Sequence, residues 1–299
     1  MYNQITENKR RTVALVSIVI LIILALGYTF DVVVGSGAGV GGLVLAMVIS
    51  IGMTLIAYYG GDRVALWTSG AKLVEKRDQP ELYRIVENLS MTAGIPTPKV
   101  HLMSDPAINA FATGRDPAHA SIAVTTGALE RLENEELEGV IAHELSHITN
   151  LDIRVMTIVI VLVGTIALLS DWLLRIRWYH GGGGRSRGGN QATAVFLIVG
   201  IVLAIVAPII AELIKLAVSR RREYLADASG ALLTRFPDGL ARALEKIAAA
   251  NQPMLRANTA TAHLFLSNPF GRKRRFFSRL FDTHPPTEER IKALRAMAI

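Results

Sequence analysis

The chain of 299 residues contains no cysteine, which excludes disulfide bonds and thiolate metal ligands and leaves the redox environment open. Charged side chains are also scarce, since only 19% of the residues are charged while 51% are hydrophobic. The mean hydropathy is accordingly positive. Uncharged runs extend over lengths at which a soluble protein would alternate polar and apolar residues, and such runs are typical of membrane-spanning helices.

Four apolar runs are candidates for such helices. They occupy residues 13–30, 39–59, 155–169 and 192–211. A span needs about 20 apolar residues, so we expect two transmembrane hairpins, one in residues 1–60 and one in residues 155–215. The first run is long for a signal peptide and lacks a convincing cleavage signal. An alternative for the second hairpin is that it is sheltered by protein or enters only one leaflet.

Basic clusters beside these runs predict the orientation of the chain in a membrane. The clusters are residues 9–11, 63–77 and 220–222. By the positive-inside rule they place the N-terminus and both parts of a catalytic domain, residues 61–154 and 216–299, in the cytoplasm. The loop at 175–190 does not fit this rule, because it carries four arginines and would lie on the outer side of the membrane. Anionic lipid headgroups suffice to explain the net charge of +7, so a bilayer and no nucleic acid is the expected partner.

The pentad His-Glu-Leu-Ser-His at residues 143–147 indicates the zinc site of a metalloprotease. Residues four apart share one face of an α-helix, so His143 and His147 can bind one zinc ion at about 2.0–2.1 Å. Glu144 lies about 100° around the helix, near enough to accept a proton from zinc-activated water. Asn134 is the expected N-cap of this helix. If the helix ran unbroken into the third apolar run, the zinc would lie about 10–12 Å above the start of that span.

A catalytic zinc site normally has three protein ligands, and no third histidine follows the pentad closely. Downstream, Glu223 and Asp227 are one helical turn apart, so Glu223 can be the third ligand while Asp227 orients another ligand through a hydrogen bond. The alternative is an exposed acidic pair that balances the neighbouring arginines. Glu212, at the end of the fourth run, is a second candidate for the third ligand.

The other segments predict a mixed soluble domain. Pro80 begins a helix that Gly94 terminates, and shorter helices are expected at residues 238–250 and 286–298. Three short strands are expected at residues 99–103, 109–113 and 121–125, separated by turn residues. The predicted fold class is therefore α+β and mostly helical, with a small β-sheet ahead of the zinc helix.

Five short segments carry a family resemblance. They are Asn-Ala-Phe-Ala-Thr-Gly at 109–114, the pentad, Arg-Glu-Tyr-Leu-Ala-Asp at 222–227, Thr-His-Pro-Pro at 283–286 and Glu-Arg-Ile at 289–291. Together with the four apolar runs, and in this order, they resemble the HtpX-type membrane zinc metalloproteases, relatives of the CAAX prenyl endopeptidases. The resemblance implies a gluzincin-like protease domain in which His143, His147 and Glu223 hold one zinc ion and Glu144 is the base.

The resemblance also implies roles for residues outside the ligand set. Asp227 would support a zinc ligand, and one strand would bind the substrate as an added strand. The residues of that strand are Asn109, Ala110, Phe111 and Ala112. His284 is implied as an active-site neighbour, although a residue before two prolines can simply occupy a turn. His284 or Tyr224 would then donate a hydrogen bond to the oxyanion.

The sequence thus predicts a multi-pass zinc endopeptidase of the cell membrane. The resemblance implies that it clears misfolded or damaged membrane proteins. One alternative is a prenyl-protein endopeptidase that acts at C-terminal motifs by the same chemistry. Another is a catalytically idle membrane scaffold, against which the intact Glu144 argues. The sequence carries no signal that fixes an oligomeric state.

Overall fold

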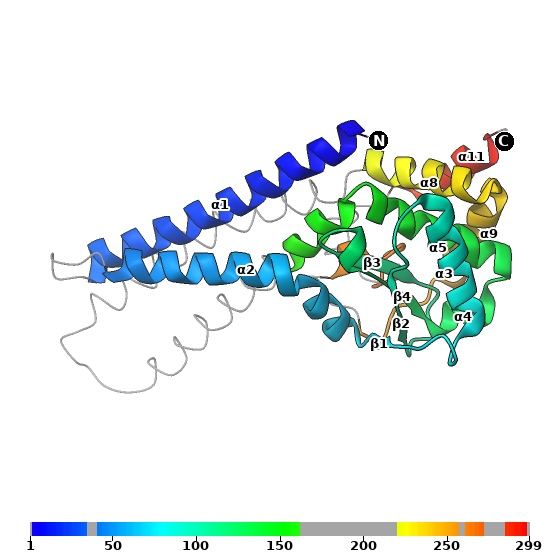
Figure 1. Cartoon of the computed structure of the whole chain (residues 1–299), viewed down its shortest axis with the longest axis horizontal. Coiled ribbons are helices and arrows are strands. Elements are labelled where there is room, and N and C mark those ends of the chain that lie inside the picture. The colour runs from blue at the N-terminus through cyan, green and yellow to red at the C-terminus, as the bar shows by residue number, and fades with distance from the viewer. Residues whose placement is uncertain (1, 35–40, 162–219, 257–260, 272–284, 298–299) are drawn as a thin grey trace.

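The structure, a computed structural model, describes residues 2–34, 41–161, 220–256, 261–271 and 285–297. A body of helices around one four-stranded sheet lies at one end of the molecule, and two long helices, α1 (Tyr2–Val34) and α2 (Gly41–Ser69), extend away from it (Figure 1). The predicted class, α+β and mostly helical with a small sheet, is confirmed. The N-terminal end of α1 lies against the body, beside α8 (Arg220–Thr234).

The helix α2 has the length and composition of a membrane span. Within the described ranges, its segment Leu43–Ser69 is the one helix long and apolar enough to cross a bilayer. Large apolar side chains point outward from it, and Leu45 and Val48 are 60% and 63% exposed. Such a surface is unfavourable in water and suits the hydrocarbon of a bilayer. Because α2 is continuous to Ser69, the domain boundary expected at residue 60 falls inside a helix.

The other expected spans are described only in part. Residues 13–30 lie within α1, which packs along α2. Most of the run at 155–169 and all of the run at 192–211 lie outside the described residues. Four membrane-spanning helices therefore stay a prediction.

The chain turns sharply after the helix that carries the pentad. This helix, α5 (Asn134–Thr149), ends at Asn150, and Leu151 adopts a left-handed φ of 60°. Residues 152–161 form a separate helix, largely buried against α1, α2 and the sheet. An unbroken helix from the pentad into the third apolar run does not form, because Leu151 leaves the right-handed helical conformation and Asp152 lies within hydrogen-bond distance of His147.

The sheet is mixed, with strand order β1-β2-β4-β3. Its strands are β1 (Lys72–Leu73), β2 (Lys99–Met103), β3 (Ala110–Gly114) and β4 (Ala120–Thr125). β2 runs parallel to β4, while β1 and β3 are antiparallel to their neighbours. The three expected strands are confirmed to within one residue; β1 was missed because two residues show no periodicity. β3 is an edge strand, buried along its whole length and in contact with α5.

The helix α3 (Pro80–Ala93) shows why local signals in this sequence are reliable. Pro80 occupies the first turn, and Gly94 ends the helix with a left-handed φ of 69° while its N–H bonds to the preceding turn. The buried apolar face consists of Leu82, Ile85, Val86 and Leu89. Each such side chain contributes about 1.5–3 kcal/mol when it is fully buried. The shorter elements are α4 (Thr126–Arg131), α9 (Pro237–Ala250), α11 (Thr287–Arg295) and the 3-10 turns Pro117–His119 and Ala262–Leu264.

Close helix packing fixes α5 at the centre of the body. A Cβ atom at Gly230 of α8 would lie 3.0 Å from the backbone nitrogen of His143, a tight contact, so a glycine here favours the close approach of α8 to α5. The first turn of α5 is closed by Glu136, whose carboxylate accepts the Glu133 N–H at 2.9 Å. Asn134 is therefore the first helical residue and not the N-cap that we expected, because Glu133 takes that position.

Candidate metal centre

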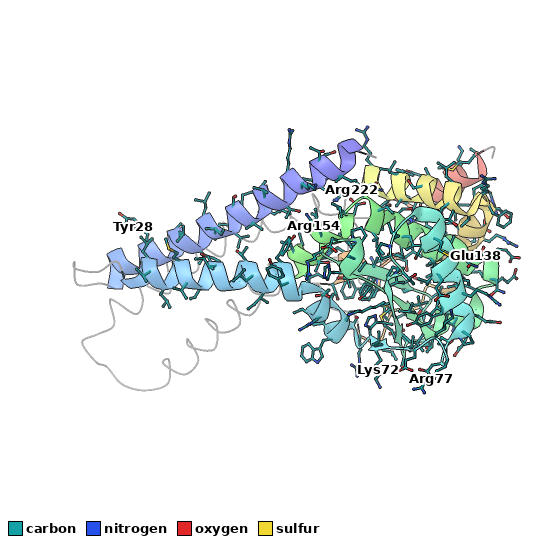
Figure 2. The ribbon with its side chains drawn as sticks, viewed as in Figure 1. Tyr28, Lys72, Arg77, Glu138, Arg154 and Arg222 are labelled. Carbon is teal, nitrogen blue, oxygen red and sulfur yellow. The ribbon has the colours of Figure 1, made fainter. Side chains whose placement is uncertain are left out.

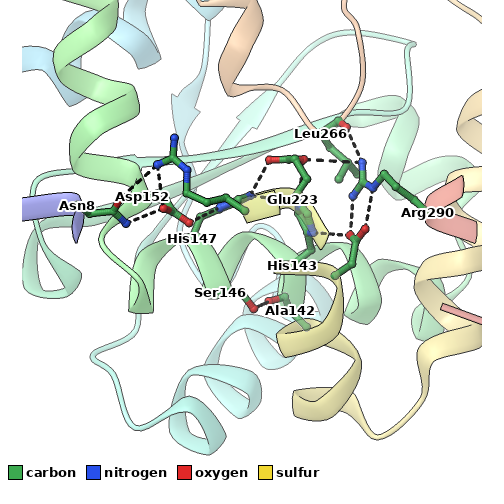
Figure 3. A network of polar contacts seen from close by, with 11 residues as sticks. Asn8, Ala142, His143, Ser146, His147, Asp152, Glu223, Leu266 and Arg290 are labelled. Carbon is green, nitrogen blue, oxygen red and sulfur yellow. Dashed lines mark hydrogen bonds and ion pairs between the residues drawn. The ribbon is translucent and has the colours of Figure 1, made fainter. Parts of the chain in front are cut away.

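Three side chains from two helices converge inside the body. His143 and His147 project from α5, and Glu223 projects from the first turn of α8 (Figure 3). The Nε2 atoms of the two histidines are 3.2 Å apart. Carboxylate oxygens of Glu223 lie 3.9 Å from Nε2 of His143 and 3.6 Å from Nε2 of His147. All three side chains are buried.

The donor atoms fit a single cation. They all lie within 4.8 Å of one another. Two tetrahedral ligands at the usual Zn–N distance of about 2.0–2.1 Å are about 3.3 Å apart, which is close to the gap between the histidine nitrogens. Two imidazoles and one carboxylate form a ligand set that zinc hydrolases use. The lone pairs of the two imidazole nitrogens and the carboxylate of Glu223 face one another inside the protein. Such a buried arrangement is stable only with a positive charge between the three groups.

The first histidine is held from behind by a carboxylate. Nδ1 of His143 lies 2.9 Å from Oδ1 of Asp227, and Asp227 accepts two hydrogen bonds from Arg290, at 2.8 Å and 2.6 Å. Burial acts to raise the pKa of Asp227, but the charge and hydrogen bonds of Arg290, together with His143, hold it at about 2. An ionised Asp227 at this distance favours a proton on Nδ1 of His143, which leaves Nε2 as a metal ligand.

The second histidine has a matching partner. Nδ1 of His147 bonds to Oδ2 of Asp152 at 3.1 Å. The other oxygen, Oδ1, accepts hydrogen bonds from Nδ2 of Asn8 at 2.7 Å and from Arg222 at 3.1 Å (Figure 3). Burial acts to raise the pKa of Asp152, but His147, Arg222 and Asn8 lower it overall, so the carboxylate stays ionised.

Glu144 lies buried between the histidines and β3. Burial raises the pKa of Glu144 to about 7, and the charge of Glu223 adds to the rise, while His147 and a hydrogen bond with the backbone of Ala112 oppose it. A carboxyl group with such a pKa can accept a proton and release it again near neutral pH. The contact with Ala112 also places this carboxyl group next to the edge strand.

The electrostatic environment around His147 is negative. Burial lowers the pKa of His143. Burial acts in the same direction on His147, yet the hydrogen bond with Asp152 and the charges of Glu223 and Glu144 raise its pKa to about 9. The site therefore attracts positive charge, and a divalent metal would displace the proton from His147 when it binds.

The resemblance implies that a substrate binds along the edge of β3. The first residues of this edge are hydrogen-bonded to another segment of the same chain. The Ala110 carbonyl accepts the N–H of Leu266 at 3.0 Å. The Asn109 side chain donates to the carbonyl of Ser267 at 3.2 Å and accepts its N–H at 3.3 Å. Asn109 and Ala110 are thus engaged by residues 266–267 in this structure.

Three further candidates were named from the sequence. His284 and Glu212 lie outside the described residues. Tyr224 follows Glu223 directly, but its hydroxyl donates to Glu289 at 2.8 Å in an exposed position. Adjacent helix residues point about 100° apart, and in this structure the hydroxyl of Tyr224 is engaged by Glu289.

Reasoning from the sequence assigned no role to four residues that contact the centre: Asn8, Asp152, Arg222 and Arg290. Both arginines stand inside segments that carry the family resemblance, but arginine is usually a surface residue. Asp152 is five positions after His147, a spacing that brings two side chains together only where a helix breaks between them. The signal that could have identified Asp152 was a carboxylate a few residues after the pentad, close to the point where the helix ends.

Comparison with known proteins relates the whole chain to proteases. Residues 76–298 match peptidase family M48. A protease HtpX homolog of Caldanaerobacter subterraneus subsp. tengcongensis is 46% identical over 300 residues, which cover 100% of this chain and 98% of that protein. A protease HtpX homolog of Tropheryma whipplei is 47% identical over 298 residues, which cover 99% of this chain and 98% of that protein.

The fold is also similar to a solved structure. The crystal structure of Ste24p from S. mikatae matches with a TM-score of 0.50 and 18% sequence identity. The match covers 98% of this chain and 67% of that one. At this identity the likeness concerns the fold alone.

Proposed function

Because the chain belongs to peptidase family M48 and is a membrane metalloprotease, we propose that His143, His147 and Glu223 hold one zinc ion. In this proposal Glu144 is the general base and Asp227 orients His143. The observation that supports it most directly is the convergence of three buried ligand atoms within 4.8 Å of one another, beside a buried glutamate.

Metal analysis and a peptide-cleavage assay on the detergent-solubilised protein test this proposal. We expect one zinc ion per chain and an activity that a chelator removes and added zinc restores. Full activity in protein stripped of metal would contradict it.

The residues of the site divide the chemistry among them. A bound zinc ion supplies Lewis-acid chemistry, which lowers the pKa of a water molecule and polarises the substrate carbonyl. Glu144 accepts the proton of the attacking water on its carboxylate and then donates it to the leaving amine. His143 and His147 keep their Nδ1 protons toward Asp227 and Asp152 throughout, so their Nε2 atoms stay available as ligands.

The substrates are polypeptides, and within this class we propose misfolded or damaged membrane proteins. The strand residues 109–112 are their proposed binding edge, because an edge strand offers main-chain hydrogen bonds that tolerate many sequences. The nearness of Ala112 to Glu144 supports this placement. Since residues 266–267 occupy the first part of the edge, a substrate either displaces them or pairs with β3 from Ala112 onward. His284 is carried over from the resemblance as a further active-site neighbour.

Prenyl-protein specificity is the less supported alternative. The likeness to Ste24p is limited to the fold, at 18% identity, whereas the HtpX homologs match at 46% and 47% over nearly their whole length. Cleavage of prenylated peptides in preference to unfolded membrane proteins would reverse this order.

For topology, we propose four membrane-spanning helices in residues 1–60 and 155–215, with residues 61–154 and 216–299 in the cytoplasm. The chain has no cysteine, so single cysteines report on sidedness without background. In intact cells Gly182→Cys should react with a membrane-impermeant thiol reagent, and Lys76→Cys should react only after the cells are permeabilised. Reaction of both variants before permeabilisation would exclude the second hairpin.

We also propose that the site works close to the membrane surface. A Cβ atom at Gly61 of α2 would lie 2.7 Å from Thr157, and the hydroxyl of Thr157 lies 2.9 Å from that of Thr113 in β3. The edge strand is thus joined to the apolar helix through a single residue. A substrate held in the same membrane gains effective concentration without any new contact to the enzyme.

The expected result is faster cleavage of a membrane-anchored substrate. With the enzyme in liposomes, one unfolded model substrate should be cleaved at least about 10-fold faster with an anchor than without it, at concentrations far below KM. The same pair of substrates in detergent is the control, where the difference should shrink. Equal rates in liposomes would contradict the proposal.

A further inference from the structure

A chain of buried hydrogen bonds links the beginning of α1 to the metal centre. Asn8, in the second turn of α1, is 2% exposed. Its Nδ2 donates to the carbonyl of Asn150 at 2.9 Å and to Oδ1 of Asp152 at 2.7 Å. Its Oδ1 accepts a hydrogen bond from Arg222 at 3.3 Å. One neutral side chain thereby joins α1, the turn after α5 and the start of α8, at the junction where Arg222 is labelled in Figure 2.

The position of Asp152 depends on this junction. His147 and Asp152 lie on opposite sides of the left-handed turn at Leu151, so the helix that carries His147 does not fix Asp152. Asn8 and Arg222 both donate to Oδ1, which leaves Oδ2 directed at Nδ1 of His147. Two donors on one oxygen set the plane of the carboxylate, and the carboxylate in turn sets the plane of the imidazole.

Asn8 contributes hydrogen bonds to this junction, and these cannot be replaced by apolar packing. An apolar side chain of the same size would fill the space but would leave the Asn150 carbonyl and Oδ1 of Asp152 without their Asn8 donors. A buried acceptor that loses a donor is destabilised, and Arg222 is then the one of the two donors left on Oδ1, so the plane of the carboxylate toward His147 is held less firmly. The basic residues that follow, Lys9 and Arg10, are exposed and lie on another face of α1.

We propose that Asn8 is a positioning residue for the metal centre, which orients Asp152 and through it His147, so that docking of α1 is a condition for tight metal binding. This inference rests on the proposed zinc site. It makes α1 a structural part of the active site.

The test is the zinc affinity of the full-length protein in detergent, measured by competition with a chelator. Asn8→Leu keeps the volume and removes the donors, and it should weaken zinc binding by about 10-fold, the lower end of the range for partners behind a ligand. The matched control is Thr12→Val, one turn further along α1, because its hydroxyl donates to the Asn8 carbonyl within the helix. Thr12→Val should leave the affinity unchanged. Asn8→Ala is a smaller change to be measured in the same way if Asn8→Leu does not fold.

A double-mutant cycle separates positioning from a general loss of stability. In an Asp152→Asn background, Asn8→Leu should change the zinc affinity by less than about 2-fold, since the group that it orients is already altered. An equal loss in both backgrounds would show that Asn8 does not act through Asp152. Unchanged affinity in folded Asn8→Leu or Asn8→Ala would overturn the inference. Absence of zinc binding by the unmodified protein would instead contradict the proposed function, so the two failures are distinguishable.

Discussion

Glu144→Gln should abolish most of the peptide cleavage while zinc stays bound. The amide fills the same buried space but cannot accept a proton, so the contribution of the general base, about 10²–10⁴-fold in rate, is lost. Glu144 is not one of the three converging ligand residues, so its replacement leaves the donor set intact. The measurements are kcat on an unfolded polypeptide and zinc content of the same preparation.

Glu138→Gln is the matched control for this variant. It makes the same chemical change on the same helix, at a residue that lies on the outside of the body, away from the site (Figure 2). Glu138→Gln should cleave at the normal rate. Normal turnover by Glu144→Gln would remove the general-base role, and loss of zinc from it would show that Glu144 helps to hold the metal.

Removal of any one ligand should remove both zinc and activity. His143→Ala, His147→Ala and Glu223→Ala each take one donor from the cluster of three, and two remaining donors do not make a catalytic zinc site. The expected result is zinc content near zero after dialysis and activity at least about 10³-fold down, because both the metal and the geometry of the base are lost. Zinc analysis and kcat/KM on each purified variant measure this.

The competing assignment of the third ligand is tested by the same experiment. Glu212 was a candidate on sequence grounds, and Glu212→Ala should retain zinc and activity if Glu223 is the ligand. If Glu212→Ala lost the metal and Glu223→Ala kept it, the ligand set would have to be redrawn. Thermal unfolding of each apo variant separates loss of metal from loss of fold, since apo variants that unfold like the apo form of the unmodified protein are intact.

Local periodicity made a large part of this protein readable from its sequence. The four-residue spacing of His143 and His147, the one-turn spacing of Glu223 and Asp227, and the proline and glycine that bound α3 are all patterns within one helix. A helix repeats every 3.6 residues wherever it lies, so such patterns need no knowledge of the rest of the chain. The strands β2, β3 and β4 were readable for the same reason.

The path of the chain beyond the end of a helix could not be predicted from local periodicity. The apolar run after the pentad suggested that the zinc helix leads straight into a membrane span. The structure instead has a break at Leu151 and a separate helix packed against α1 and α2. A non-glycine residue with positive φ has no sequence signature of its own, since surrounding contacts and not its propensity hold it there.

What the sequence by itself determined is the chemistry that is available: two imidazoles on one helix face, a glutamate between them and, within the described residues, one apolar helix long enough for a bilayer. The sequence also predicted Asp227 as a support for a ligand, but only the tertiary structure decided that Asp227 lies at His143 and that Asp152 lies at His147. Asn8 reaches Asp152 across 144 positions, and Arg290 reaches Asp227 across 63. Such contacts follow from how helices far apart in the sequence pack against one another. A buried charge is stable only beside its partner, so the fold selects the partner and the sequence alone does not name it.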